Sequence, residues 1–182
     1  MAKNRSISEP DERSGIAGVY HAVGMVWLAV RVVVFAVLYS GTFLALIPSW
    51  FVGAGQFSVG WARWVGLIPL VIGAFVVVVC IVGFAVRGRG TPAPFDPPRQ
   101  LVTGWMYGRV RNPIYLGGTL ILLGEAIVWQ SLALVGYAVG MWLIWHLLVV
   151  WYEEPALQRR FGASYSQYRT TVRRWLPSLR SP

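Results

Sequence analysis

The sequence predicts an all-α fold: a polytopic membrane helical bundle of about four transmembrane helices, followed by short cytoplasmic C-terminal helices. First, 56% of the 182 residues are hydrophobic and only 13% are charged, whereas soluble domains are nearer 25% charged. Second, four apolar segments are long enough to be considered as membrane spans. Third, ten tryptophans and eight tyrosines suit an aromatic belt at the membrane interfaces.

The chain divides into a short tail and one membrane domain. Residues 1–15 are polar and mixed in charge, and they lack the basic region followed directly by an apolar core that a secretory signal needs. We therefore expect a disordered cytoplasmic tail there. Residues 16–182 form the predicted domain, in which residues 16–28 either extend the first span or lie along the membrane surface.

The four spans are expected at about residues 29–48, 64–86, 113–129 and 132–151. Only Gln130 and Ser131 separate the last two, which predicts a tight antiparallel hairpin. The connection at 87–112 is rich in proline, which stiffens an extended path. It is either a solvated linker or a lid over a cytoplasmic pocket.

Positive charge sets the expected orientation. Arginines collect in the 87–112 connection and after the fourth span, so positive-inside counting places both termini and this connection in the cytoplasm. The net charge is +9, and anionic membrane lipids are the expected partner because the arginines flank apolar segments. No nucleic-acid-binding motif accompanies the charge. The single cysteine, Cys80, allows no intrachain disulfide and gives no zinc spacing, so no metal is expected.

The tail after Pro155 is predicted to form amphipathic helices over residues 155–176. Its apolar residues recur every three or four positions, and Gly162 is expected to break the segment into two short helices. The helices either lie in the headgroup layer or pack back over the hairpin and close a site. The recurring residues are Leu157, Phe161, Tyr165, Tyr168, Val172 and Trp175.

The motif "VRNPIYLGG" at residues 110–118 marks the start of the third span. Asn112 is a good N-cap, and Pro113 suits the first helical position. Such a helix start presents free backbone N–H groups and the positive end of a helix dipole. With Arg109 and Arg111 alongside, it could bind a carboxylate or a phosphate.

The stretch "HLLVVWYEEP" ends the fourth span with two acids. On an α-helix His146 and Glu153 share one face because they are seven residues apart, and Glu154 lies about 100° further round. The simple interpretation is a pair of solvated glutamates that pair with Arg159 or Arg160. However, an ionisable group at membrane depth suggests a function, and this face could hold a zwitterionic, cationic ligand. No P-loop or dinucleotide fingerprint is present.

Several ordered motifs now resemble a known superfamily. They are Arg111-Asn112-Pro113-Ile114-Tyr115-Leu116-Gly117, Glu153-Glu154-Pro155-Ala156-Leu157, "FGASYSQY" at 161–168 and "RWLP" at 174–177. Together they cover roughly residues 88–177. The chain resembles the integral-membrane methyltransferases related to isoprenylcysteine carboxyl methyltransferase and to phospholipid N-methyltransferases. The loop before Arg111 is similar to that of bacterial relatives, which implies the bacterial inner membrane.

The resemblance implies S-adenosylmethionine as the methyl donor, S-adenosylhomocysteine as its product, and no metal. It places the donor on the cytoplasmic side, between the last two spans and the C-terminal helices. Expected catalytic residues are Glu153, Glu154, Arg111 and Arg174, the last paired with a carboxylate of the donor or with Glu154. Expected donor-binding residues are Asn112, Pro113, Tyr115, Leu116, Gly117, His146, Glu153, Tyr165 and Tyr168.

The acceptor and the oligomeric state stay open at this point. The motifs suit a prenylated or other lipid-linked carboxylate, a phospholipid amine, and a small thiol or hydrophobic metabolite alike. Asn112 stands where the prenylcysteine enzymes more often have His, which weakens the first of these. The alternative to an enzyme is a non-catalytic membrane binding or scaffold protein that retains the methyltransferase fold.

Overall fold

The computed structural model describes residues 37–83 and 101–177, together with a few helical residues between 23 and 34. The predicted tail at 1–15, part of the first span, residues 84–86 of the second span and residues 87–100 of the connection predicted as a linker or a lid lie outside the described residues. Within them the fold is all helical, as predicted, and no β-strand is present beyond the isolated bridge between Gln56 and Ser131.

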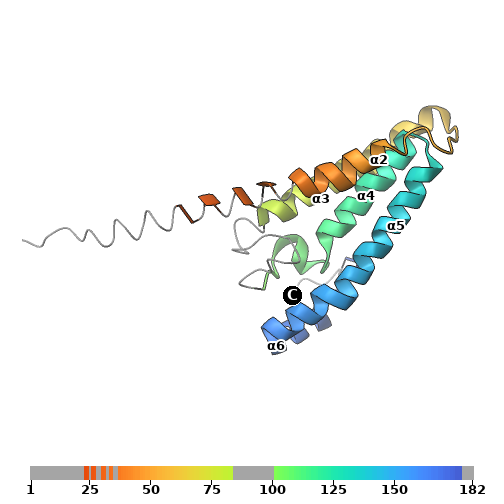
Figure 1. Cartoon of the computed structure of the whole chain (residues 1–182). Helices are drawn as coiled ribbons and strands as arrows, with labels where there is room; N and C mark the ends of the chain where they lie inside the picture. Colours follow the sequence, from red (N-terminus) through yellow and green to blue (C-terminus); the bar gives the residue numbers. More distant parts are fainter. Residues whose placement is uncertain are drawn as a thin grey trace, which may run out of the picture.

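The helices lie side by side along most of their length (Figure 1). The first apolar helix reaches Ser49 and contains the π-turn η1 (Thr42–Leu46) and α2 (Ile47–Ser49). The 3₁₀ segment η2 (Gly60–Gly66) leads into α3 (Leu67–Gly83). After the short η4 (Trp105–Gly108) come α4 (Pro113–Val128), α5 (Leu132–Leu148), the π-turn η5 (Val149–Glu153) and α6 (Glu154–Thr171).

Among the described residues, two helices are long and apolar enough to cross a membrane. They are Gly60–Gly83, with 24 residues, and the run Leu132–Thr171, with 40 residues and a bend at Gly162. Val37–Ser49 and Pro113–Val128 are shorter apolar helices. The apolar part of the second run is α5 together with η5, and α6 after it is polar.

Glycines bring α3 and α4 into close backbone contact. A Cβ on Gly73 would lie 2.5 Å from the carbonyl oxygen of Gly117, and one on Gly124 would lie 2.7 Å from that of Gly66. No side chain fits in either place, so these glycines set the distance between the helices, as small residues do in membrane helix pairs.

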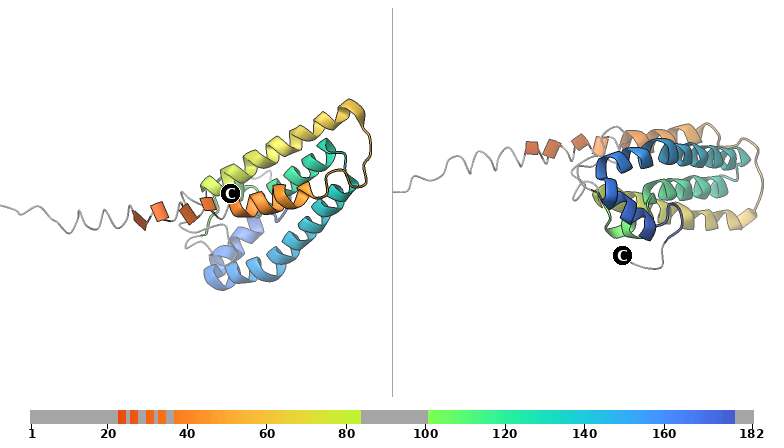
Figure 2. Two further views of the ribbon diagram at one scale, coloured as in Figure 1. Left: turned by 45° about the horizontal axis from the view of Figure 1, so that its top comes forward. Right: turned by 90° about the horizontal axis from the view of Figure 1, so that it is seen from below.

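The turns at one end of the bundle are joined by hydrogen bonds. Ser131 Oγ donates to the carbonyl oxygens of Phe51 and Ala54 at 2.8 Å each, and it accepts from Leu134 N as the cap of α5. The α4–α5 hairpin therefore has the predicted tight turn, and the 50–59 segment is fixed against it (Figure 2, left).

Helix α6 is bent at Gly162, as predicted. This residue has φ 51° and ψ −121° inside an otherwise helical run, a conformation that glycine adopts without a steric penalty. Beyond the bend, Tyr165, Tyr168 and Val172 are buried against Leu101, with Leu157 and Phe161 packed on them. The apolar stripe thus packs back onto the segment before α4. The second alternative placed it over the hairpin, and its closing of a site there stays a prediction.

Candidate functional site

Most of the predicted site residues meet at the end of the bundle opposite the hairpin turn. There α4 begins, α5 passes through η5 into α6, and α6 folds back beneath them (Figure 1 and Figure 2, right). Residues 172–177, which we call the C-terminal segment, follow α6 and lie across the start of α4. The site is therefore assembled from parts of the chain that are far apart in sequence.

The C-terminal segment is fixed to the motif at 111–112. The backbone N–H of Arg111 donates to the carbonyl oxygen of Arg173 at 2.9 Å, and Asn112 Nδ2 donates to that of Arg174 at 3.2 Å. Asn112 occupies the N-cap position, as predicted, but its side chain makes no capping bond to α4. Its amide instead holds the C-terminal segment. Pro113 is the first helical residue and is buried.

Glu154 is the centre of a buried ionic cluster. Arg174 donates to it twice, from Nε to Oε1 at 2.7 Å and from Nη2 to Oε2 at 2.8 Å. Arg111 Nη1 lies 2.9 Å from Glu154 Oε1, and Arg169 Nη2 lies 3.9 Å from Glu154 Oε2. Of the two partners predicted for Arg174, the structure shows Glu154. Three arginines around one carboxylate leave the cluster with a surplus of positive charge.

The charges in this cluster have shifted pKa values. Burial opposes ionisation of Glu154, but the hydrogen bonds from Arg174 and the charges of Arg111, Arg174 and Arg169 outweigh it and lower the pKa of this carboxyl. The hydrogen bonds to Glu154 raise the pKa of Arg174. Both shifts favour the ion pair, which therefore persists throughout the physiological pH range.

Arg111 keeps unused hydrogen-bonding capacity. Its side chain is only 11% exposed, yet its buried Nε and Nη1 have no aligned hydrogen-bond acceptor among the described residues. Nη1 is close enough to Glu154 for electrostatic attraction, but the bond geometry is not met. Buried guanidinium N–H groups without acceptors are costly, and a carboxylate or phosphate would satisfy them.

Glu153 has a different environment from its neighbour. Its Oε1 accepts a hydrogen bond from the hydroxyl of Tyr115, which is buried at the start of α4. The Tyr115 ring lies beside that of Trp145, with 5.7 Å between centroids. Glu153 is thus a carboxylate among aromatic rings, whereas Glu154 is surrounded by guanidinium groups.

The π-turn η5 explains why adjacent glutamates separate. Glu154 N donates to Val149 O, a bond across five residues that adds one residue to the turn. Later residues are then rotated back by about 100° relative to an ideal α-helix. The expectation that Glu153 shares a face with His146 is therefore wrong, and Glu154 takes that position. Accordingly, His146 and Glu154 bind consecutive residues, Trp175 and Arg174.

His146 is held by tryptophans. Its Nδ1 accepts a hydrogen bond from Trp175 Nε1 at 3.1 Å. Its ring stacks on Trp142 at 5.4 Å and lies 5.8 Å from that of Trp175. These contacts fix the C-terminal segment against α5. Contact between His146 and a methyl donor stays a prediction.

Tyr165 and Tyr168 pack within the protein in this structure. Tyr165 is 2% exposed, and the hydroxyl of Tyr168 donates to the carbonyl oxygen of Tyr107 at 2.6 Å. Burial raises the pKa of Tyr168 well above its usual range, so it stays a neutral donor. Stacking of these rings on adenine also stays a prediction.

The remaining predicted residues are at the start of α4. Leu116 is half-buried and donates its backbone N–H to Asn112 O. Gly117 faces α3, where a Cβ would lie 2.9 Å from the carbonyl oxygen of Gly73. Gly117 therefore has a packing role, and its predicted contact with a donor is not tested by this geometry.

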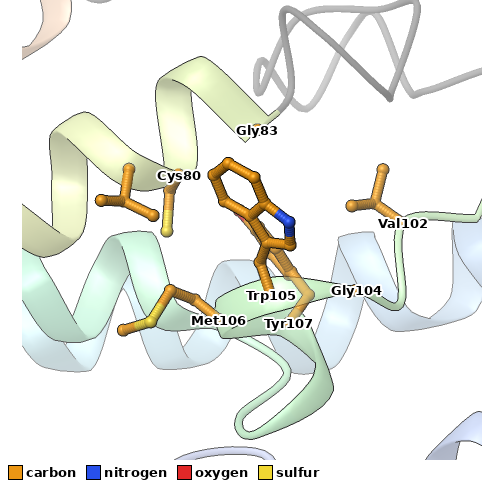
Figure 3. A pocket seen from close by; sticks show the side chains of 8 residues that line it. Cys80, Gly83, Val102, Gly104, Trp105, Met106 and Tyr107 are labelled. Atoms are coloured by element: carbon orange, nitrogen blue, oxygen red, sulfur yellow. The ribbon is translucent and has the colours of Figure 1, made fainter.

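A small apolar hollow lies beside the site, between the end of α3 and η4 (Figure 3). Cys80 and Trp105 face it, and Tyr107 stands at its inner side. Its lining includes Val79, Gly83, Val102, Gly104 and Met106. The hollow has room for about one water molecule.

Two members of the site, Tyr39 and Trp145, were not predicted from the sequence. Trp145 is 2% exposed, and its Nε1 donates to the hydroxyl of Tyr39 on the first helix. The signal for Tyr39 was present, because a tyrosine hydroxyl inside an apolar span needs a hydrogen-bonding partner. Nothing in the sequence identifies Trp145 as that partner.

In the described part of the chain, the helices and the buried polar cluster define a helical bundle with a candidate site at one end. The family model for phospholipid methyltransferase matches residues 61–164, more than half of the chain, and the chain belongs to this family. The match confirms the superfamily that the motifs predicted. A search of curated protein sequences finds no significant match.

Proposed function

We propose that the chain is an S-adenosylmethionine-dependent methyltransferase whose acceptor is lipophilic or embedded in the membrane. The family supports methyl transfer. The choice of site rests on the different environments of the two glutamates. Glu153 is hydrogen-bonded to Tyr115 among aromatic rings, whereas Glu154 lies within the arginine cluster. The acceptor is either an isoprenylcysteine-type carboxylate or a phospholipid amine.

The residues fit the two charged ends of the donor. The buried Nε of Arg111, which has no acceptor among the described residues, and the positive end of the α4 dipole suit its carboxylate. Glu153, whose carboxylate accepts a hydrogen bond from Tyr115, suits its positively charged sulfonium and ammonium groups. The expected contacts of Asn112, His146 and Tyr165 with the donor belong to the same proposal.

The donor supplies an activated methyl group with a neutral leaving group, so no covalent enzyme intermediate is needed. The protein then acts mainly by positioning, which contributes on the order of 7–11 kcal/mol at best. A carboxylate acceptor needs no base. An amine acceptor arrives protonated, and Glu153 is placed to take the proton before transfer. Tyr115 orients the carboxylate for this step.

The orientation in the membrane is part of the proposal. We place four spans across the bacterial inner membrane, with both termini and the site on the cytoplasmic side. This is supported by the arginines near the site end, including Arg109, Arg159 and Arg160, and by the positive-inside rule. An acceptor would then enter sideways from the lipid.

The test is calorimetric binding of S-adenosylhomocysteine to the full chain in detergent. We expect micromolar binding by the wild type and a loss of at least tenfold in Glu153→Gln. The matched control is Glu125→Gln, the same change at a carboxylate in the last turn of α4. Glu125 lies about 15 Å along α4 from Tyr115, so this variant should bind as the wild type does.

Two results would contradict the proposal. Unchanged binding in both Glu153→Gln and Arg174→Ala would show that the donor does not use this cluster. No binding by a folded, monodisperse wild type, with or without lipid, would favour a non-catalytic membrane protein that retains the fold. If binding is found, an acceptor screen with lipid amines and prenylcysteine analogues follows.

A further inference from the structure

The first helix reaches the proposed donor site although it lies outside the family match. The match begins at residue 61, whereas Tyr39 precedes it by more than twenty positions. Nevertheless, the Tyr39 hydroxyl accepts a hydrogen bond from Trp145 Nε1 on α5. The Tyr39 ring is itself supported by Phe43, with 5.0 Å between centroids.

Trp145 is confined on several sides. Its indole packs on the bare backbone of Gly118, where a Cβ would lie 2.8 Å from Trp145 Cη2. Its ring lies 5.7 Å from that of Tyr115. The only polar atom of its side chain, Nε1, donates a hydrogen bond to the Tyr39 hydroxyl. A small rotation of the indole would therefore either break this bond or press on Tyr115.

Tyr115 transmits this position to Glu153, because its hydroxyl donates to Oε1 of that carboxylate. The contacts thus form a continuous series from Tyr39 through Trp145 and Tyr115 to Glu153. The series joins the first helix, α5, α4 and η5, so the carboxylate is placed by elements on both sides of the site.

We infer that Tyr39 is a positioning residue for methyl-donor binding, and that it acts through Trp145 and Tyr115 on Glu153. The inference rests on the proposed function. Its physical basis is that an indole N–H can only donate. Removal of the Tyr39 hydroxyl leaves this N–H buried without an acceptor, a costly state. The indole is then expected to turn, and Tyr115 loses its support.

The experiment is a double-mutant cycle with the full chain in detergent. The variants are Tyr39→Phe, Trp145→Phe and the double variant, and the readout is the dissociation constant of S-adenosylhomocysteine. We expect Tyr39→Phe alone to weaken binding about five- to tenfold, because Tyr115 then no longer holds Glu153 in position. In the Trp145→Phe background no N–H remains to be satisfied, so Tyr39→Phe should add less than a twofold change.

A matched control separates this role from general packing of the first helix. The hydroxyl of Tyr137 also binds that helix, with a hydrogen bond to Phe43 O at 3.0 Å. Tyr137→Phe is therefore the same chemical change at another contact with the first helix. It should bind S-adenosylhomocysteine within twofold of the wild type, and all variants should remain monodisperse.

The outcomes are distinct. If the wild type binds and Tyr39→Phe binds equally well, the inference is overturned and the proposed function stands. If Tyr39→Phe weakens binding by the same factor in both backgrounds, Tyr39 contacts the donor directly and the positioning role is overturned. If Tyr137→Phe weakens binding as much as Tyr39→Phe, helix packing is the cause. If the folded wild type does not bind, both proposals fall together.

Discussion

Replacement of Arg174 by alanine tests whether the Glu154 cluster holds the C-terminal segment. The change removes two hydrogen bonds to a carboxylate, at 2.7 and 2.8 Å. Loss of one partner from a fully buried pair costs about 3–5 kcal/mol. The Arg174 side chain is 29% exposed, and Arg111 remains near Glu154, so the expected cost is smaller, about 2 kcal/mol.

The assay is thermal unfolding of the detergent-solubilised chain, followed by tryptophan fluorescence. A loss of this size corresponds to a Tm lower by about 4–8 °C for a chain of this length. Arg173→Ala is the matched control. Its side chain is exposed, and its contact with Arg111 uses only the backbone carbonyl oxygen, so its Tm should stay within about 1 °C of the wild type.

A double-mutant cycle with Glu154→Gln isolates the pair. Glu154→Gln should destabilise the protein more than Arg174→Ala does, because it leaves three guanidinium groups without their counter-charge. The coupling free energy of the two changes is expected to be about 1–2 kcal/mol. A coupling near zero, or an Arg174→Ala variant as stable as Arg173→Ala, would refute the view that this ion pair anchors the segment.

Two further predictions concern packing and pH. Gly73→Ala places a Cβ 2.5 Å from a carbonyl oxygen of α4 and should lower the free energy of unfolding by about 1–3 kcal/mol. The control Gly136→Ala has open space around it and should leave the stability unchanged. Equal Tm values for the two variants would contradict the close contact. The pKa of Glu154 is lowered in the folded state, so its ionic contribution is complete above the ordinary value of about 4.3 and is lost as pH falls through the lower, folded-state value. Acidification below about pH 4.3 should therefore lower the Tm of the wild type more than that of Glu154→Gln, and parallel pH profiles would contradict this.

Much of the fold follows from patterns that are local in sequence. Pro113 begins a helix because its φ is already helical and its missing N–H is not needed there, and the structure starts α4 at this residue. Gly162 bends α6 because a positive φ favours glycine. The end of α4 at Val128 and the start of α5 at Leu132 were predictable from the apolar pattern, because the polar residues Gln130 and Ser131 interrupt it there.

Contacts between distant parts of the chain were not predictable in the same way. The sequence marks Arg174 and Glu154 as charges that need partners, but any nearby arginine would satisfy that rule, and Arg159 and Arg160 were the simpler choice. The fold-back of α6 brings Arg174 to Glu154 instead. Likewise, Tyr39 needs a partner by the chemistry of its hydroxyl, yet only the packing of the first helix on α5 selects Trp145.

The π-turn gives the physical answer to why two acids stand side by side at the end of an apolar helix. In an ideal α-helix, residues 146 and 153 would face one way and residue 154 would point about 100° aside. The added residue in η5 turns Glu154 toward Arg174 and leaves Glu153 beside Tyr115. One acid can then hold the C-terminal segment in place while the other stays available among aromatic rings. Under the proposed function this division separates anchoring of the site from binding of a cationic donor, and a π-turn at a functional site is a recurrent use of this strained geometry.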